Sequence, residues 1–108
     1  MKDECCEETT ARLIRLPDCG REMQAYNKGL LAVKKIRYDG CEVSNVPAVD
    51  YILRIENVVD YLFELKGKNL EHALDQIIST VERMTISGDI MDSVFAAVYC
   101  KQFPSASR

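Results

Sequence analysis

The sequence has few of the features that mark membrane, secreted or zinc-binding proteins. No apolar stretch approaches the roughly 20 residues that a helix needs to cross a bilayer, and the acidic start, MKDECCEETT, has no apolar core of the kind found in signal peptides. His72 is the only histidine and no CxxC pair occurs, so the spacings of short zinc motifs are absent. We therefore expect a soluble cytoplasmic protein that contacts no membrane, and structural zinc is not favoured.

The composition is that of an ordinary globular protein. The chain has 108 residues, of which 47% are hydrophobic and 29% are charged, and this balance argues against disordered and fibrous classes. No internal repeat or low-complexity tract interrupts it. Because this length is typical of one domain with a modest core, we expect a single domain over residues 1–108. Residues 1–20 are its poorly defined N-terminal extension.

The five cysteines form an odd set without an evident pairing. Cys5 and Cys6 are adjacent in sequence and are poorly placed to pair with each other. Cys41 and Cys100 lie in apolar segments, which is typical of small core residues. Since thiols in a cytosolic protein are reduced by default, we expect free cysteines.

The net charge of −3 argues weakly against a nucleic-acid partner. Acids are concentrated in the first ten residues, however, while residues 11–68 carry a small excess of positive charge. A polyanion would therefore meet the middle of the chain, through residues such as Lys34, Lys35, Arg37 and Lys68. The alternative is a mixed-charge surface in contact with solvent, and charge alone favours that alternative.

Four segments are predicted to be β-strands. Residues 32–38 end in an Asp-Gly turn pair, and residues 49–55 are rich in β-branched and aromatic side chains. Residues 58–66 form the second arm of a hairpin with 49–55, and their long apolar content is typical of a central strand. Residues 93–100 are predicted as a last buried strand.

An amphipathic helix is predicted over residues 70–84. Asn69 can cap its start, and a Ser-Gly-Asp sequence ends it. Apolar side chains recur along it at steps of three and four, which is typical of a helix with one buried stripe. The stripe consists of Leu70, Ala73, Leu74, Ile77, Ile78, Val81 and Met84. The members expected to be buried against the sheet are Leu74, Ile77, Ile78 and Val81.

The first third of the chain has weaker signals. Residues 9–16 fit either a short helix or an edge strand, and residues 17–20 are predicted to form a turn. Residues 21–32 have helical propensity, although Asn27 and Gly29 weaken it. We expect a helix in this last segment.

The order of these elements predicts the layout of the sheet. The tight hairpin between the second and third strands makes them antiparallel. A helix between the third and fourth strands implies a right-handed crossover, which sets those two strands parallel. The predicted fold class is therefore α/β, with a small mixed sheet flanked by helices.

Three residues near the ends of the hairpin could form a catalytic site. Asp50 lies at the start of one strand, and Glu64 and Lys66 lie near the end of its neighbour. Because residues two apart on a strand point to one face, Glu64 and Lys66 are expected to project together. Two close carboxylates can share Mg²⁺, a hard cation that prefers oxygen. The metal polarises a phosphate and activates a water, and an ammonium offsets charge, so the pattern predicts phosphodiester hydrolysis.

The same residues also allow structural explanations. Acids and bases are frequent enough in this chain for such a spacing to arise by chance. Glu64 and Lys66 can form a salt bridge on an exposed face, although unpaired charge is expensive in a strand that looks central. Asp50 can cap a turn near Pro47, and His72 is expected at the surface of the first helical turn rather than as a general base.

The segments DYILRI, FELKGKNLEHALDQI and VFAAVYC resemble the PD-(D/E)XK nuclease superfamily, the restriction-endonuclease-like proteins, and in particular its small bacterial and phage members. The resemblance covers residues 33–103. It implies an αβββαβ core and a DNA endonuclease that depends on Mg²⁺ or Mn²⁺. Asp50 and Glu64 would be the metal ligands and Lys66 the catalytic lysine, while Gln76 matches a glutamine that some branches carry near the site.

The chain departs from this superfamily in two places. Val49 stands where a proline often precedes the aspartate, and Glu22 is the candidate for the acid on the first helix without aligning clearly. Some members have lost catalysis, so the alternative is an inactive interaction protein, for example an inhibitor that binds a protein partner. A plain α/β module is the third possibility. A nuclease this small would gain reach over DNA as a homodimer, and closed two-fold dimers are the commonest assembly.

Overall fold

The computed structural model describes residues 1–18, 20–65 and 69–99. Strands dominate this part of the chain, and none of its helices is long and apolar enough to cross a membrane. The elements are the short 3₁₀ helix η1 (Asp3–Cys5), β1 (Cys6–Thr9), β2 (Leu13–Asp18), β3 (Arg21–Tyr26), β4 (Val33–Arg37), β5 (Tyr51–Ile55), β6 (Val59–Glu64), α1 (Leu70–Ser87) and β7 (Ser93–Val98).

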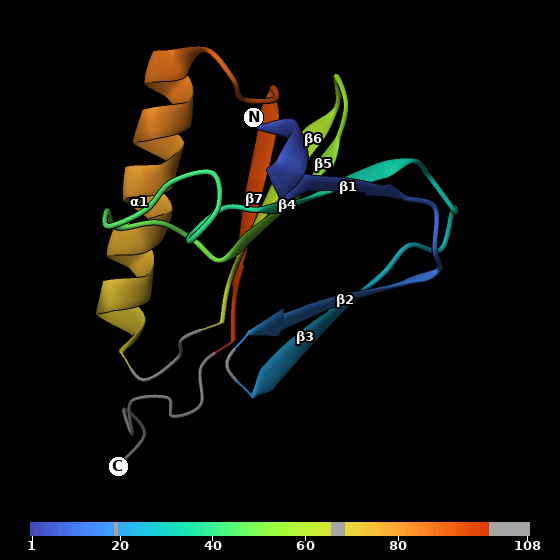
Figure 1. Cartoon of the computed structure of the whole chain (residues 1–108), viewed down its shortest axis with the longest axis horizontal. Helices are drawn as coiled ribbons and strands as arrows, with labels where there is room; N and C mark the ends of the chain where they lie inside the picture. Colours follow the sequence, from blue (N-terminus) through green and yellow to red (C-terminus); the bar gives the residue numbers. More distant parts are fainter. Residues whose placement is uncertain (19, 66–68, 100–108) are drawn as a thin grey trace.

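Five strands form one mixed sheet in the order β1-β4-β5-β6-β7 (Figure 1). The first four of these pair antiparallel in turn, and β7 pairs parallel to β6. α1 connects β6 to β7 and supplies the crossover that parallel neighbours require. The predicted α/β class, the antiparallel hairpin of β5 and β6 and the parallel last strand are therefore confirmed. The expectation that the last strand is buried is wrong, because β7 lies at the edge of the sheet and half of its residues are exposed.

The sheet is covered on both faces, but by different structures (Figure 1). α1 packs on one face, and the hairpin of β2 and β3 lies on the other, where a second helix was expected. The helix-side core contains Ile36, Tyr38, Ala48, Val49, Ile52, Leu62 and Met84. The hairpin-side core contains Ile14, Leu16, Val33, Tyr51, Leu53 and Leu65. Since successive residues of β5 belong to alternate cores, this central strand is buried on both faces.

The helix predicted over residues 21–32 is wrong. The segment begins with strand β3, which pairs antiparallel with β2. Burial alternates along β3, with Met23 and Ala25 half-buried and Gln24 and Tyr26 exposed, which is the period of a strand. Modest helical propensity is outweighed here because alternate side chains of an extended segment can cover the hairpin-side core.

Strand β2 decides between the two alternatives for residues 9–16. The strand begins at Leu13 and carries Ile14 and Leu16 into the hairpin-side core. It continues through the first half of the predicted turn at residues 17–20. The chain then turns at Gly20, whose φ of +80° lies in the left-handed region that favours glycine.

The caps of α1 agree with the prediction. The side chain of Asn69 accepts a hydrogen bond from the backbone N–H of His72 at 3.1 Å, so it caps the first turn. At the other end, Gly88 adopts a left-handed φ of 76°, and its N–H bonds to carbonyls of the last turn. The helix runs to Ser87 rather than stopping at Met84.

The buried face of α1 differs from the predicted stripe. Leu74 and Ile78 are 47% and 55% exposed, so the prediction that they are buried is wrong. Ile77 and Val81 are half-buried at the margin of the helix-side core. The positions that are fully buried against the sheet are Ala73, Gln76, Thr80 and Met84.

A hydrogen bond between helix and sheet explains this rotation of α1. The hydroxyl of Thr80 accepts from the backbone N–H of Val49 at 3.0 Å and donates to the carbonyl of Gln76 at 2.8 Å. The bond holds the face that carries Gln76 and Thr80 against the start of β5. Leu74 and Ile78 are consequently displaced to one flank of the helix.

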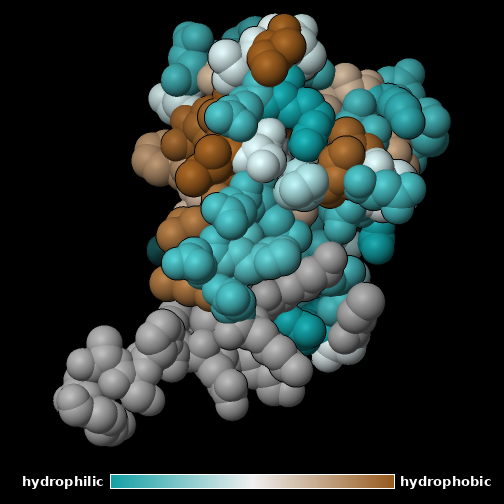
Figure 2. Space-filling view, turned by 90° about the vertical axis from the view of Figure 1, so that its left-hand side faces the viewer, coloured by the Kyte–Doolittle hydropathy of each residue, from teal (hydrophilic) through white to brown (hydrophobic). Residues whose placement is uncertain are grey.

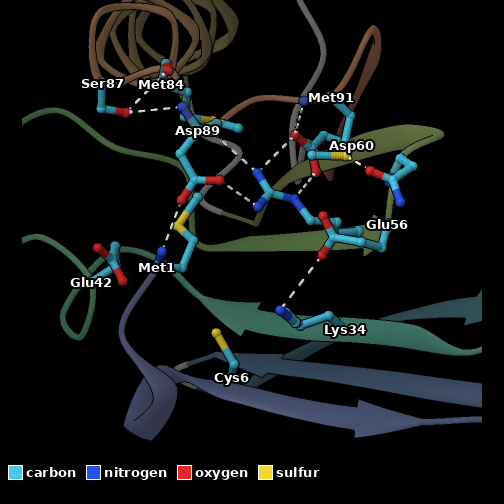
Figure 3. A network of polar contacts seen from close by, with 12 residues as sticks. Met1, Cys6, Lys34, Glu42, Glu56, Asp60, Met84, Ser87, Asp89 and Met91 are labelled. Atoms are coloured by element: carbon cyan, nitrogen blue, oxygen red, sulfur yellow. Dashed lines mark hydrogen bonds and ion pairs between the residues drawn. The ribbon is translucent and has the colours of Figure 1, made fainter.

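A charge network joins β5, β6 and the segment after α1 (Figure 3). Arg54, which is 4% exposed, donates to the two carboxylate oxygens of Asp60 at 2.7 and 3.1 Å. It also donates to Asp89 at 2.6 Å, and the amino group of Met1 donates to the other Asp89 oxygen at 2.8 Å. Burial alone lowers the pKa of Arg54, but its hydrogen bonds to the two carboxylates outweigh burial and raise that pKa.

The expectation of free cysteines is wrong for two of them. Cys5 and Cys41 form a disulfide across 36 positions of sequence. Cys41 lies half-buried in the turn after β4 rather than in a core. Because β1 pairs with β4, the start of the chain is carried to this turn. Cys6 is the free cysteine of the described residues, and Cys19 and Cys100 lie outside them.

Candidate functional site

The two predicted carboxylates lie side by side at one end of the β5–β6 hairpin. Tyr51 pairs with Phe63, so the register places Asp50, one residue earlier, next to Glu64, one residue later. The backbone N–H of Asp50 extends the ladder by donating to the carbonyl of Phe63 at 3.1 Å. Neighbouring strands are about 4.8 Å apart, so the two residues start from adjacent backbone positions.

Both carboxylates are buried. Glu64 is 0% exposed and Asp50 is 5% exposed. Glu64 follows Leu62 by two residues and therefore points to the α1 side of the sheet, as Leu62 does. One oxygen of Asp50 accepts a hydrogen bond from the backbone N–H of Leu65 at 2.7 Å. Such a charge-assisted bond holds the carboxylate in one orientation.

Gln76 approaches the same region from α1. It lies one helical turn before Thr80, whose hydroxyl bonds to the residue that precedes Asp50. The side chain is 8% exposed, and its Oε1 atom is buried without a hydrogen-bond donor among the residues that the structure describes. Buried polar atoms in proteins nearly always have a partner, so this oxygen is a marked feature of the site.

Of the other residues considered for the site, the structure describes His72 but not Lys66. Lys66 lies outside the described residues, so the expectation that it projects together with Glu64 has no counterpart here. His72 is exposed in the first turn of α1, which confirms its expected surface position. Asp50 bonds to Leu65 across the hairpin, which differs from the suggested cap of a turn near Pro47.

The donor atoms of the site are oxygens. Within residues 1–18, 20–65 and 69–99, no three His, Cys, Asp or Glu side chains are grouped closely enough to hold a metal ion. The candidate donor set is therefore a pair of carboxylates supplemented by the neutral amide oxygen of Gln76. Such a set suits a hard cation that retains several waters rather than zinc or another soft metal.

Basic side chains gather on the opposite face of the same strand end. The Lys35 ammonium and the Arg37 guanidinium lie 5.6 and 5.7 Å from the centre of the Tyr51 ring. Arg21 donates to the carbonyl of Leu65 at 2.7 Å. The sequence indicated Lys35 and Arg37 as candidates for contact with a polyanion. It did not indicate Arg21, because that residue was assigned to a helix, whereas its position here depends on the hairpin of β2 and β3.

An apolar cavity of about 390 Å³ lies elsewhere, between the end of β3 and the sheet. Of the described residues that line it, Lys28 alone is charged. Tyr26, at its edge, is 71% exposed, and Leu31 is 50% exposed. Cavities of this size and polarity are typical of sites that receive an apolar group. The sequence offered no signal for it, because the loop and the sheet face are far apart along the chain.

Comparison with known proteins gives no relative of this chain. No protein-family model matches it, and neither a curated protein nor a solved structure is similar enough to be matched.

Proposed function

We propose that this chain is a Mg²⁺-dependent DNA endonuclease of the restriction-endonuclease-like type. The observation that carries the proposal is the convergence of Asp50, Glu64 and Gln76 on the interior between the sheet and α1. The order β4-β5-β6-α1-β7 supports it, since this is the βββαβ succession that the sequence resemblance implies. The β2–β3 hairpin stands where such a core has its first helix, and this is a departure from the pattern.

The residues present fit a divalent cation. Two carboxylates and an amide oxygen are the ligand types that Mg²⁺ and Mn²⁺ prefer. A cation beside Gln76 would give its buried Oε1 atom a partner. When bound, the ion would polarise the phosphodiester and activate the attacking water.

The protein's own groups would then position the substrate and balance charge. The Leu65 N–H holds the Asp50 carboxylate in place. Lys66, two residues after Glu64, would offset negative charge as it develops on the phosphate. Lys35 and Arg37, on the other face of the strand end, would contact the DNA backbone, where contacts position a protein without reading sequence.

Cleavage of DNA tests the proposal directly. Wild-type protein should cut supercoiled plasmid or single-stranded DNA when Mg²⁺ or Mn²⁺ is added. Glu64→Gln and Lys66→Ala should each lower the rate by about 100-fold or more, because they remove charge at the reacting centre. Glu82→Gln is the matched control, since Glu82 is an exposed carboxylate on α1, and its rate should equal that of wild type.

Thermal unfolding gives a second readout that needs no substrate. Millimolar Mn²⁺ should raise the Tm of the wild type by mass action, and should raise that of Glu64→Gln much less. The nuclease proposal would be refuted if the wild-type protein cut none of the substrates and its Tm did not change when divalent ions were added.

The second candidate is a non-catalytic interaction protein, which the apolar cavity beside Tyr26 favours. A partner's aliphatic or aromatic side chain would bury Tyr26 and Leu31, both of which are exposed at its edge. In that case Glu64 has a structural role only. Glu64→Gln and Lys66→Ala would then lose stability, and divalent ions would change neither Tm nor any activity.

A further inference from the structure

The two edges of the central sheet are protected to different degrees. β1 forms one edge and carries Glu7 and Glu8, which lie opposite Lys35 and Lys34 of β4. Charged side chains on an edge discourage pairing with another chain. β7 forms the other edge, and the sequence from Ser93 to Tyr99, SVFAAVY, contains neither a charged residue nor a proline.

The backbone of β7 offers hydrogen-bonding groups to a further strand. Tyr99 donates its N–H to Glu64 of β6, and alternate residues of a strand direct their N–H and C=O groups to opposite edges. The groups of Val94, Ala96 and Val98 therefore point away from β6. Within the described part of the chain, no strand pairs with this side of β7.

Apolar side chains flank this edge on both faces of the sheet. On the hairpin side, Phe95 is 58% exposed and stacks on Tyr61, with 5.6 Å between ring centres. On the helix side, the exposed Leu74 and Ile78 lie on one flank of α1. Arg83, whose guanidinium bonds to Tyr38 and Pro47 near β4, lies on the opposite flank.

The position of these side chains is visible on the surface. Figure 2 looks onto the α1 side of the molecule and shows hydrophobic side chains gathered along one border of that face, beside a hydrophilic centre. With Arg83 anchoring the β4 side of the helix, Leu74 and Ile78 lie over the β7 edge. An open strand edge with apolar groups above and below it is the arrangement expected of an interface.

We propose that β7 pairs antiparallel with β7 of a second copy of this chain, about a two-fold axis through Ala96. In this register Ala96 exchanges both backbone bonds with its symmetry mate, and Val94 does so with Val98 of the other copy. Phe95 lies opposite Ala97, so a large side chain meets a small one. The α1 helices share one face of the continuous sheet, where Leu74 and Ile78 of the two copies meet.

A second copy suits this edge better than other occupants for two reasons. The strand is neutral, so self-pairing places no like charges opposite each other. The exposed groups also lie on both sides of the proposed axis, which allows the same patch to serve both subunits of a closed dimer. The interface does not depend on the proposed nuclease activity.

A charge-swap experiment tests the register. Ala96 is exposed, so lysine or glutamate can be introduced there without burying charge in the monomer. Like charges at the axis should weaken the dimer of Ala96→Lys, and that of Ala96→Glu, by about tenfold or more in dissociation constant. An equal mixture of the two variants should recover the dimer, measured by light scattering over a dilution series. Ile86→Lys, at a position 88% exposed on α1, is the control and should leave the dimer intact.

Hydrogen exchange on the full-length wild type gives an independent measurement. The amides of Val94, Ala96 and Val98 should be protected at high protein concentration and should exchange faster on dilution. If the protection of these amides were the same at all protein concentrations, the chain's own residues would cover the edge. That result would overturn the proposal. A wild type that stays monomeric at high concentration, or single variants that dimerise as wild type does, would overturn it too.

Discussion

On its α1 side the central sheet buries charged and polar side chains beside its apolar core, whereas its hairpin side buries an apolar cluster. Arg54, Asp60 and Glu64 all point toward α1, which adds Gln76 and Thr80 from its own buried face. On the other side, the residues in contact are those of the hairpin-side core, from Ile14 to Leu65. β5 contributes to both sets from alternate positions, with Arg54 on the α1 side and Tyr51 and Leu53 on the hairpin side.

This difference indicates a division of roles between the two faces. Apolar burial is non-directional and stabilises the fold in proportion to the area removed from water. Buried polar groups are costly unless they are paired, and they impose specific geometry on their neighbours. Apolar burial on both faces therefore stabilises the fold, and the α1 side in addition supplies the polar positions on which the proposed site depends.

The largest effect is expected from breaking the charge network. Arg54→Ala leaves Asp60, which is 0% exposed, without its bidentate partner. Removing one member of a buried ion pair costs about 3–5 kcal/mol, and urea unfolding measures the loss. Replacing both residues, as Arg54→Leu with Asp60→Leu, should recover most of it, since a matched apolar pair is often neutral. A loss below about 1 kcal/mol in Arg54→Ala would contradict burial of the pair.

On the hairpin side the effect should come from lost packing alone. Leu16 is 0% exposed, and Leu16→Ala should lower the free energy of unfolding by about 2–5 kcal/mol. Because no charge is involved, the loss should be the same in low and high salt. A loss in Leu16→Ala that varied with salt would mean that charge contributes on the hairpin side too.

The pH dependence of stability should reflect the α1 side. The hydrogen bond from the Met1 amino group, and then the one from Arg54 to the carboxylate, hold the pKa of Asp89 below its usual 3.8. The same bond raises the pKa of the Met1 amino group above its usual 8.0. Asp89 therefore stabilises the fold above about pH 4, and this is lost as pH falls through its lowered pKa. The amino group contributes below about pH 8, and this is lost as pH rises through its raised pKa.

Asp89→Asn should consequently reduce the fall in stability at both acidic and alkaline pH. The measurement is Tm as a function of pH. Asp92→Asn is the control, because Asp92 is exposed nearby and should leave the profile unchanged. Identical profiles for wild type and Asp89→Asn would show that the pair with Met1 does not contribute to stability.

The smallest effect is expected on the outer flank of α1. Leu74 is 47% exposed, so Leu74→Ala should change the free energy of unfolding of the dilute monomer by less than about 1 kcal/mol. The same substitution at Ile77, which packs at the margin of the helix-side core, should cost more. Similar losses at both positions, in urea unfolding at low concentration, would mean that the flank is buried.

Much of the sheet and part of the site could be predicted from local patterns. The strands 33–37, 51–55 and 59–64 have strong β composition, and the tight connection after Ile55 leaves only one close register for the hairpin. That register brings Asp50 and Glu64 together, because it counts equal numbers of residues back from the turn. The parallel placement of β7 follows from the need for a crossover helix.

Other features were hidden because they depend on contacts between distant segments. The sequence Arg21–Tyr26 has both helical propensity and a strand-like alternation, and only the apolar face of the sheet selects the strand. The disulfide of Cys5 with Cys41 requires β1 to lie beside β4.

The sequence by itself determined where α1 begins, where it ends and that it has an apolar side, since capping and periodicity act over a few residues. Only the tertiary structure decided which side faces the sheet. The bond from Val49 to Thr80 joins residues 31 positions apart and turns Gln76 inward. No local pattern contains that bond, because a hydroxyl finds its partner only once the sheet has formed. The same rotation leaves Leu74 and Ile78 exposed on the flank of the helix.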